Sequence, residues 1–173
     1  MKKWIGKLLF AALSGLLVFL IGGIFIKKAK AEQAAERIKR LPDLALTDIS
    51  GDTFRTDQIH SGPLLITFFH PECDHCRYEI LSFIGSGLLN EHLTVLFFSH
   101  ADEGEVESFM QELGVPDTPN LHIFHDHDFG LSRLFGADIM PSNFLYNDSL
   151  QLVKVFKGST RPEAILKYLY GHD

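Results

Sequence analysis

Leu64–Cys76, which reads LLITFFHPECDHC, joins an apolar run of strand length to a segment of helical character. The continuous run Leu64–Phe69 is typical of a strand that is buried on both faces of a parallel sheet. Cys73 and Cys76 are the two cysteines of the chain. Two thiols separated by two residues at a strand-to-helix junction form a small reversible disulfide, so this stretch predicts redox chemistry.

Strands and helices are predicted to alternate on both sides of this stretch. That order predicts an α/β fold in which helices flank a central mixed β-sheet. It also places the cysteines at the carboxyl end of a central strand, where open α/β sheets form their sites. The predicted strands are 44–49, 64–69, 93–99, 121–124, 142–146 and 150–156, and the predicted helices are 76–89, 103–113, 129–135 and 162–170.

The N-terminal region predicts one transmembrane helix. Leu8–Ile26 has 19 uncharged residues, enough to cross a bilayer core, and lysines flank it on both sides. Ala29-Lys30-Ala31 resembles a signal-peptide cleavage site, but the apolar run is longer than a usual signal core and two lysines precede the site. We therefore expect an uncleaved anchor over 1–30, a polar spacer over 31–40 and a folded domain over 41–173.

The charge of the chain argues against a nucleic-acid surface. Residues 31–173 carry 10 basic and 22 acidic side chains, a net charge of −12. A domain that binds nucleic acid usually presents a basic face, so no nucleic-acid partner is expected. Fifteen phenylalanines and 46% hydrophobic residues are enough to fill a compact core.

The two cysteines are expected to differ in role. At the start of a helix, unpaired backbone N–H groups and the helix dipole favour an anion, which would stabilise a Cys73 thiolate. Cys76, one turn later, would resolve a mixed disulfide between Cys73 and a substrate. His75 would add positive charge nearby, whereas Asp74 would oppose it. The reactive group is thus a Cys73–Cys76 disulfide, with no other cofactor and no metal.

The chain resembles the thioredoxin-like thiol-disulfide oxidoreductases, over roughly residues 41–170. It is most similar to the membrane-anchored TlpA/ResA-like branch, which serves cytochrome c maturation and related extracytoplasmic thiol reduction. The resemblance lies in the entry LPDLALTDISGD from Leu41, in Cys73-x-x-Cys76 followed by Glu79, and in the segment GADIMPSNFL from Gly136.

This resemblance implies roles for further residues. Pro141 would form a cis peptide bond facing the disulfide, and the backbone of Met140 would pair with a bound polypeptide. Asp74 and His75, between the cysteines, would also contact the substrate. Glu79 matches an acidic position of the branch and would carry protons to or from Cys76. The alternative for Glu79 is a solvated helix residue.

The resemblance also implies partners and a location. The partners would be protein thiols or disulfides, apocytochrome c among the candidates, and a membrane thiol carrier would supply electrons. The domain would then lie on the extracytoplasmic side of a bacterial cytoplasmic membrane. The lysines and arginines oppose this orientation: six lie between Lys27 and Arg40 and three precede the apolar run, which by the positive-inside rule favours a cytoplasmic domain.

Three positions depart from the pattern of the family. Glu72 replaces the usual aromatic residue before the first cysteine, Thr67 replaces the buried acid of ordinary thioredoxin, and Asp74-His75 replaces Gly-Pro or Glu-Pro. These departures leave the redox potential and the direction of electron flow open.

Two alternatives use the same fold. A copper-binding module would use Cys73, Cys76, His70 and His75, with His122, His125 and His127 as further ligands. The usual copper carriers place three residues between their cysteines, and this chain has two. A peroxiredoxin-type peroxidase would need proline at position 66 and threonine or serine at position 70, where the chain has Ile66 and His70.

Overall fold

The chain forms two compact units, Met1–Glu36 and Arg37–Asp173. The computed structural model describes residues 4, 15, 19–26, 32, 36–59, 62–90 and 92–171. The predicted anchor over 1–30 lies largely outside these residues. Within them, residues 19–26 are helical, and no helix is long and apolar enough to cross a membrane.

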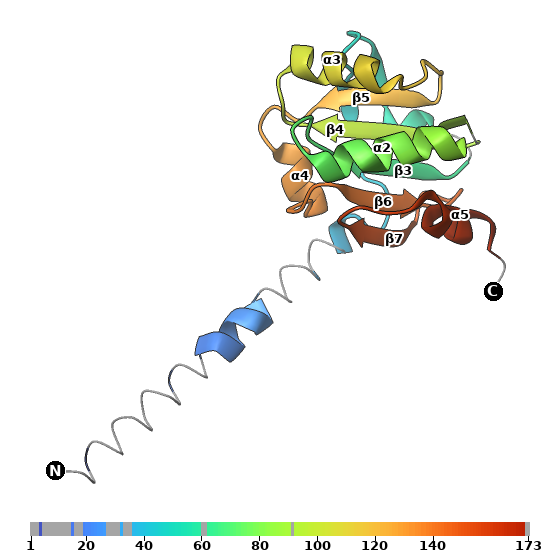
Figure 1. The fold of residues 1–173 in the computed structure, drawn as a ribbon. Helices are drawn as coiled ribbons and strands as arrows, with labels where there is room; N and C mark the ends of the chain where they lie inside the picture. The colour runs from blue at the N-terminus through green and yellow to red at the C-terminus, as the bar shows by residue number, and fades with distance from the viewer. Residues whose placement is uncertain are drawn as a thin grey trace. The chain divides into compact units, whose positions relative to one another are not determined.

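The second unit is built on a five-stranded mixed sheet with the order β5-β4-β3-β6-β7 (Figure 1). The central strand β3 pairs in parallel with β4 and antiparallel with β6. The predicted α/β fold with a central mixed sheet is therefore confirmed. The strands are β3 (Leu64–Phe68), β4 (Thr94–Ser99), β5 (Leu121–His125), β6 (Ser142–Tyr146) and β7 (Leu152–Lys157).

Helices cover both faces of this sheet and create two cores. One core joins the sheet to α2 (Asp74–Ser86), α3 (Glu103–Leu113) and α5 (Pro162–Tyr170). The other joins it to α4 (Gly130–Phe135) and to the segments that precede β3. Because both faces are covered, all five residues of β3 are buried, which explains its uninterrupted apolar run.

Helix α2 begins earlier than predicted. Cys73 is its N-cap residue, so the helix starts at Asp74, and Gly87 ends it in the left-handed conformation at φ 77°. Its inner face contains Cys76, Glu79, Ile80 and Phe83. Leu81 follows Ile80 directly, so helical geometry turns it outward, and it is 45% exposed.

Two other boundaries differ from the sequence prediction. Ile38 and Leu41 are buried, and the Ile38 carbonyl accepts a hydrogen bond from the Tyr146 hydroxyl at 2.9 Å, so part of the predicted spacer packs on the domain. Strand β7 begins at Leu152, because Leu150 has a φ of 56° and belongs to the turn that follows β6. The first difference arises from a contact that is distant in sequence, and the second from the local conformation of the turn.

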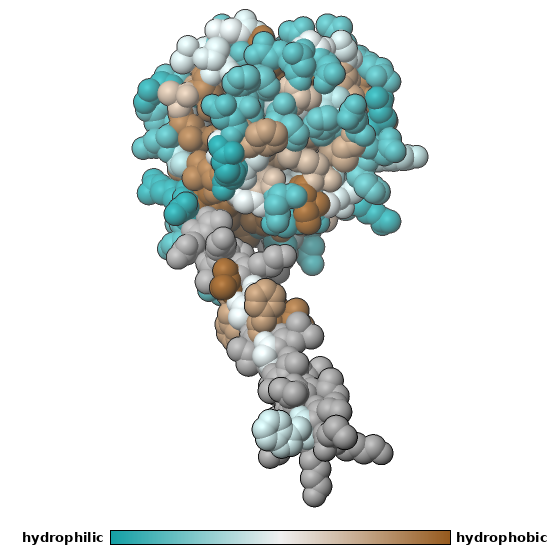
Figure 2. Space-filling view, turned by 90° about the vertical axis from the view of Figure 1, so that its left-hand side faces the viewer, coloured by the Kyte–Doolittle hydropathy of each residue, from teal (hydrophilic) through white to brown (hydrophobic). Residues whose placement is uncertain are grey.

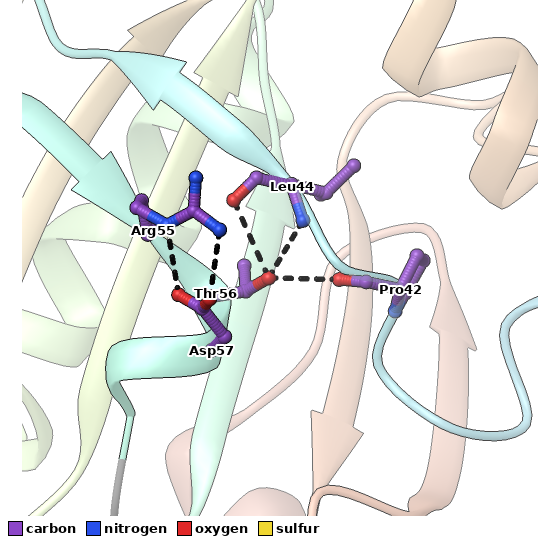
Figure 3. Close-up of polar contacts among 5 residues, drawn as sticks. All are labelled: Pro42, Leu44, Arg55, Thr56 and Asp57. Carbon is purple, nitrogen blue, oxygen red and sulfur yellow. Dashed lines mark hydrogen bonds and ion pairs between the residues drawn. The ribbon is translucent and has the colours of Figure 1, made fainter.

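A small hairpin, β1 (Ala45–Thr47) with β2 (Thr53–Arg55), precedes the sheet. The buried Thr56 ties its two ends together (Figure 3). Its Oγ1 accepts a hydrogen bond from the Leu44 N–H at 2.8 Å and donates one to the Pro42 carbonyl at 2.8 Å. One hydroxyl therefore satisfies two backbone groups where the chain enters the domain.

Replacing Thr56 by valine should destabilise the domain. The change keeps the shape but leaves the Leu44 N–H and the Pro42 carbonyl without their partner, which costs about 1–3 kcal/mol of unfolding free energy. Urea denaturation would measure it. Thr53→Val, at an exposed position of β2, is the matched control and should change stability little. Equal stability of the two variants would contradict this role of Thr56.

Candidate active site

Cys73 lies where β3 passes into α2. Its Sγ accepts a hydrogen bond from the Cys76 N–H at 3.2 Å, so the sulfur faces the free amides at the helix start. Both cysteines are free thiols. Free amide N–H groups and the helix dipole attract negative charge at a helix N-terminus, which is a favourable position for a nucleophilic sulfur. Because Cys73 is partly exposed, its sulfur is the one that an incoming disulfide can reach.

Cys76 is completely buried on the inner face of α2. Burial raises the pKa of its thiol above the ordinary value, and its hydrogen bond to Cys73 acts in the same direction. A thiol that keeps its proton and is shielded from solvent does not begin an exchange reaction. The geometry therefore fits Cys73 as the attacking thiol and Cys76 as the resolving thiol.

The segment 139–142 lies against Cys73. The Met140–Pro141 peptide bond is cis, and the Cys73 thiol donates a hydrogen bond to the Met140 carbonyl at 3.8 Å. Pro141 itself is buried, and its carbonyl accepts a hydrogen bond from the Gly158 N–H at 2.9 Å. The structure thus brings the cysteine pair next to the segment that contains Pro141, although the two lie far apart in the sequence.

Asp74 and His75 are exposed in the first turn of α2. They lie beside Cys73 on the surface, as contact with a substrate requires. Glu72, at the position where the family usually has an aromatic residue, is also exposed, and its N–H donates to His70 Nδ1 at 3.2 Å. The rim of the site is therefore polar on the α2 side.

Two apolar side chains are exposed at the end of the sheet where Cys73 lies. Ile139, next to Met140, is 49% exposed, and Phe129 is 46% exposed. The centroids of the Phe129 and His100 rings lie 4.5 Å apart, and His100 directly follows β4. Figure 2 views the side on which β4 ends and shows hydrophobic surface between hydrophilic side chains. The surface around the thiol therefore offers both polar and apolar contacts.

Glu79 is buried directly below this surface, at 1% exposure. One carboxylate oxygen accepts a hydrogen bond from Asn143 Nδ2 at 2.8 Å, and the other accepts from the Thr160 N–H. Burial raises the pKa of Glu79 to about 7, although both hydrogen bonds act in the opposite direction. The alternative of a solvated helix residue is wrong, because α2 packs this position against the sheet.

Neither Asn143 nor Thr67 is predicted from the sequence as a site residue, and Thr67 stands out in the sequence only as a departure from the family pattern. The two are register partners on β6 and β3, and the Thr67 hydroxyl donates to Asn143 Oδ1 at 2.7 Å. The available signal was a polar residue inside each of two strongly apolar strands. That signal does not identify the partner, which depends on how β3 and β6 pair.

Histidines also follow the ends of neighbouring strands. The rings of His70 and His100, which follow β3 and β4, lie 4.8 Å apart, and those of His125 and His127 lie 5.3 Å apart at the end of β5. Within the described ranges, however, no group of three or more histidine, cysteine or acidic residues is arranged to hold a metal ion. The copper alternative gains no support from this geometry.

The family model of the AhpC/TSA family matches residues 38–155. The chain belongs to the AhpC/TSA family. The match covers the hairpin, both cysteines, Glu79 and the segment around Pro141. No curated protein matches the chain significantly.

Solved structures with this fold include a secreted Mycobacterium tuberculosis disulfide oxidoreductase homologous to Escherichia coli DsbE. It is 20% identical, covers 77% of this chain and 96% of its own, and has a TM-score of 0.62. StoA from Bacillus subtilis is 16% identical, with 73% and 96% covered and a TM-score of 0.58. The exposed lipoprotein thioredoxin of Streptococcus pneumoniae is 19% identical, with 73% and 96% covered and a TM-score of 0.59.

Family and fold together confirm the resemblance predicted from the sequence. This member of the AhpC/TSA family has the thioredoxin-like fold of thiol-disulfide oxidoreductases. Its cysteine pair stands at the carboxyl end of the central strand, as predicted.

Glu79 should make stability depend on pH. Below about pH 4.5 this carboxyl is protonated in both the folded and the unfolded chain. Between there and about pH 7 the unfolded chain ionises Glu79 while the folded protein keeps it protonated, so the free energy of unfolding falls as pH rises, by an amount on the order of 3 kcal/mol. Urea denaturation between pH 4.5 and 7.5 measures this slope.

Glu79→Gln should flatten that part of the stability curve, because glutamine does not ionise. Glu163→Gln, an exposed carboxylate on α5, is the control and should leave the slope as it is. A slope that persists in Glu79→Gln would show that another group causes it.

Proposed function

We propose that this protein exchanges a Cys73–Cys76 dithiol with disulfides of extracytoplasmic proteins. In the reducing direction, the Cys73 thiolate attacks a substrate disulfide, forms a mixed disulfide and releases one substrate thiolate. Cys76 then attacks the Cys73 sulfur, which forms the Cys73–Cys76 disulfide and releases the second substrate thiolate. Two electrons pass to the substrate, and each released thiolate takes up a proton. The oxidising direction is the reverse of these steps.

The observation that carries this proposal is the position of the Cys73 sulfur. It lies at the start of α2, partly exposed, and 3.8 Å from the carbonyl of Met140, which precedes the cis Pro141. An extended substrate that pairs with the backbone of Met140 would bring its own disulfide to this sulfur. Asp74 and His75 on one side and the exposed Ile139 on the other would contact the same segment.

Glu79 fits the role of proton carrier for Cys76. Resolution requires Cys76 to lose a proton that burial makes difficult to remove. A carboxyl with a pKa of about 7 accepts and returns protons near neutral pH, which is where general acid–base groups are most effective. The raised pKa of Cys76 also favours the reducing direction, because the dithiol gains little stability from ionising this thiol.

The proposed setting is a bacterial cytoplasmic membrane with the domain on its extracytoplasmic side. The uncharged run Leu8–Ile26 supports the anchor, and the similarity to the TlpA/ResA-like branch supports the location. Apocytochrome c is one candidate substrate, and a membrane thiol carrier is the proposed source of electrons. Both follow by analogy with that branch.

Cys76→Ser in the full chain should trap a mixed disulfide. With oxidised glutathione, Cys73 should form an adduct with one glutathione that persists, because the resolving thiol is missing. In Cys73→Ser the buried Cys76 should react at least about 100-fold more slowly, since reactivity follows thiolate character and access. Mass spectrometry measures both adducts. Faster reaction of Cys76 than of Cys73 would reverse the assigned roles.

The location is testable with a membrane-impermeant maleimide. In spheroplasts that express full-length Cys76→Ser and have been reduced briefly with dithiothreitol, Cys73 should be labelled without lysis. The double variant Cys73→Ser, Cys76→Ser controls for labelling of other groups. Labelling that appears only after lysis would place the domain in the cytoplasm, as the lysine and arginine distribution favours.

A further inference from the structure

We infer that Asn143 is a positioning residue that sets the ionisation of Glu79, with Thr67 as its second contact. The inference rests on the proposed role of Glu79 as the proton carrier for Cys76. It assigns a task to two polar side chains that neither the cysteine motif nor the cis-proline segment explains.

The contacts form one buried chain across three elements. The Thr67 hydroxyl on β3 donates to Asn143 Oδ1 at 2.7 Å, and Asn143 Nδ2 on β6 donates to Glu79 Oε1 on α2 at 2.8 Å. The Thr160 N–H, just before α5, donates to Glu79 Oε2. Thr67 and Asn143 have no exposed surface and Glu79 is 1% exposed, so the three groups are shielded from bulk solvent.

The chemistry of the three groups explains why an amide stands at position 143. An ionised carboxylate only accepts hydrogen bonds, so it selects the orientation in which the amide NH2 faces it. Once Glu79 is protonated, its O–H can donate to an amide that has turned its oxygen inward. The Thr67 hydroxyl suits either orientation, because it both donates and accepts. Asn143 and Thr67 can thus keep Glu79 hydrogen-bonded in both protonation states, but the bond to the ionised carboxylate is the stronger one, so Asn143 favours the ionised form.

Among the groups around Glu79, Asn143 has the largest effect in lowering the pKa of its carboxyl. Burial and, in addition, the negative charge of Glu79 raise the pKa of Cys76 on the same helix, whereas β3, β6 and the turn before α5 contribute the neutral donors Thr67, Asn143 and Thr160. The Asn143 hydrogen bond is the largest influence that lowers the pKa of Glu79 against its burial. Its loss should hold Glu79 in the protonated form at neutral pH.

The test is Asn143→Leu in the full chain. Carbon-13 NMR of the side-chain carboxyl of Glu79 gives the titration midpoint. The midpoint should rise, with a roughly tenfold to hundredfold change in the ionisation equilibrium, because a hydrogen bond to a charged group is lost. Asn143→Thr, which returns a hydroxyl donor, should recover part of the change. A midpoint equal to that of the unmodified protein would overturn the inference.

Tyr146→Phe is the matched control. Tyr146 is also buried on β6 and loses one hydrogen bond, to the Ile38 carbonyl, but it belongs to the core on the other face of the sheet. It should leave the Glu79 midpoint unchanged, and an equal rise in this variant would mean that general loosening of β6 is the cause. If Asn143→Leu does not fold, Thr67→Val is the deciding variant. A rise in the titration midpoint of Glu79 supports the inference, and an unchanged midpoint overturns it.

A second measurement separates this inference from the proposed function. The rate at which Cys76 resolves a preformed Cys73–glutathione disulfide is followed against pH, and its midpoint should move with that of Glu79. If the NMR midpoint rises in Asn143→Leu while the pH profile of resolution stays in place, Asn143 does set the ionisation of Glu79. In that case it is the proposed proton transfer by Glu79 that fails.

Discussion

The pairing of β3 with β6 is the constraint on which the rest of the structure depends. Cys73 follows the end of β3 after residues 69–72, and β6 begins directly after Pro141, so the antiparallel register of the two strands decides where these segments meet. Residues separated by 67 positions come within 3.8 Å of each other at the Cys73 sulfur and the Met140 carbonyl. The same register places Thr67 opposite Asn143. A change in register would therefore move Cys73 away from Met140 and, at the same time, Thr67 away from Asn143.

The interface between α2 and the sheet combines two opposing requirements. It belongs to one of the two apolar cores of the domain, and burial there disfavours every charged form. Yet it contains a thiol that must ionise to resolve a disulfide and a carboxyl with a pKa of about 7. Neutral hydrogen-bond donors from β6 and from the turn before α5 make this compatible, since they stabilise the carboxylate without adding charge.

Local features of the sequence predicted much of the fold. The bounds predicted for α3 and α5 match the structure, because Asp102 caps the first, Gly114 ends it, and Pro162 opens the second. Predictions were less accurate where distant contacts decide the conformation. Ile38 became part of the domain because its carbonyl accepts a hydrogen bond from the Tyr146 hydroxyl, a contact between residues far apart in the sequence.

The sequence by itself determined the cysteine pair at a strand-to-helix junction, the proline segment downstream and the order of strands and helices. These follow from residue types, spacing and local periodicity, together with the resemblance to a known family. Only the tertiary structure decided that Glu79 is buried, that its carboxyl titrates near pH 7, and that Asn143, 64 residues away, is its partner. The physical reason is that desolvation and hydrogen bonding at a buried carboxyl depend on which elements pack around it, and those contacts join residues far apart in the chain.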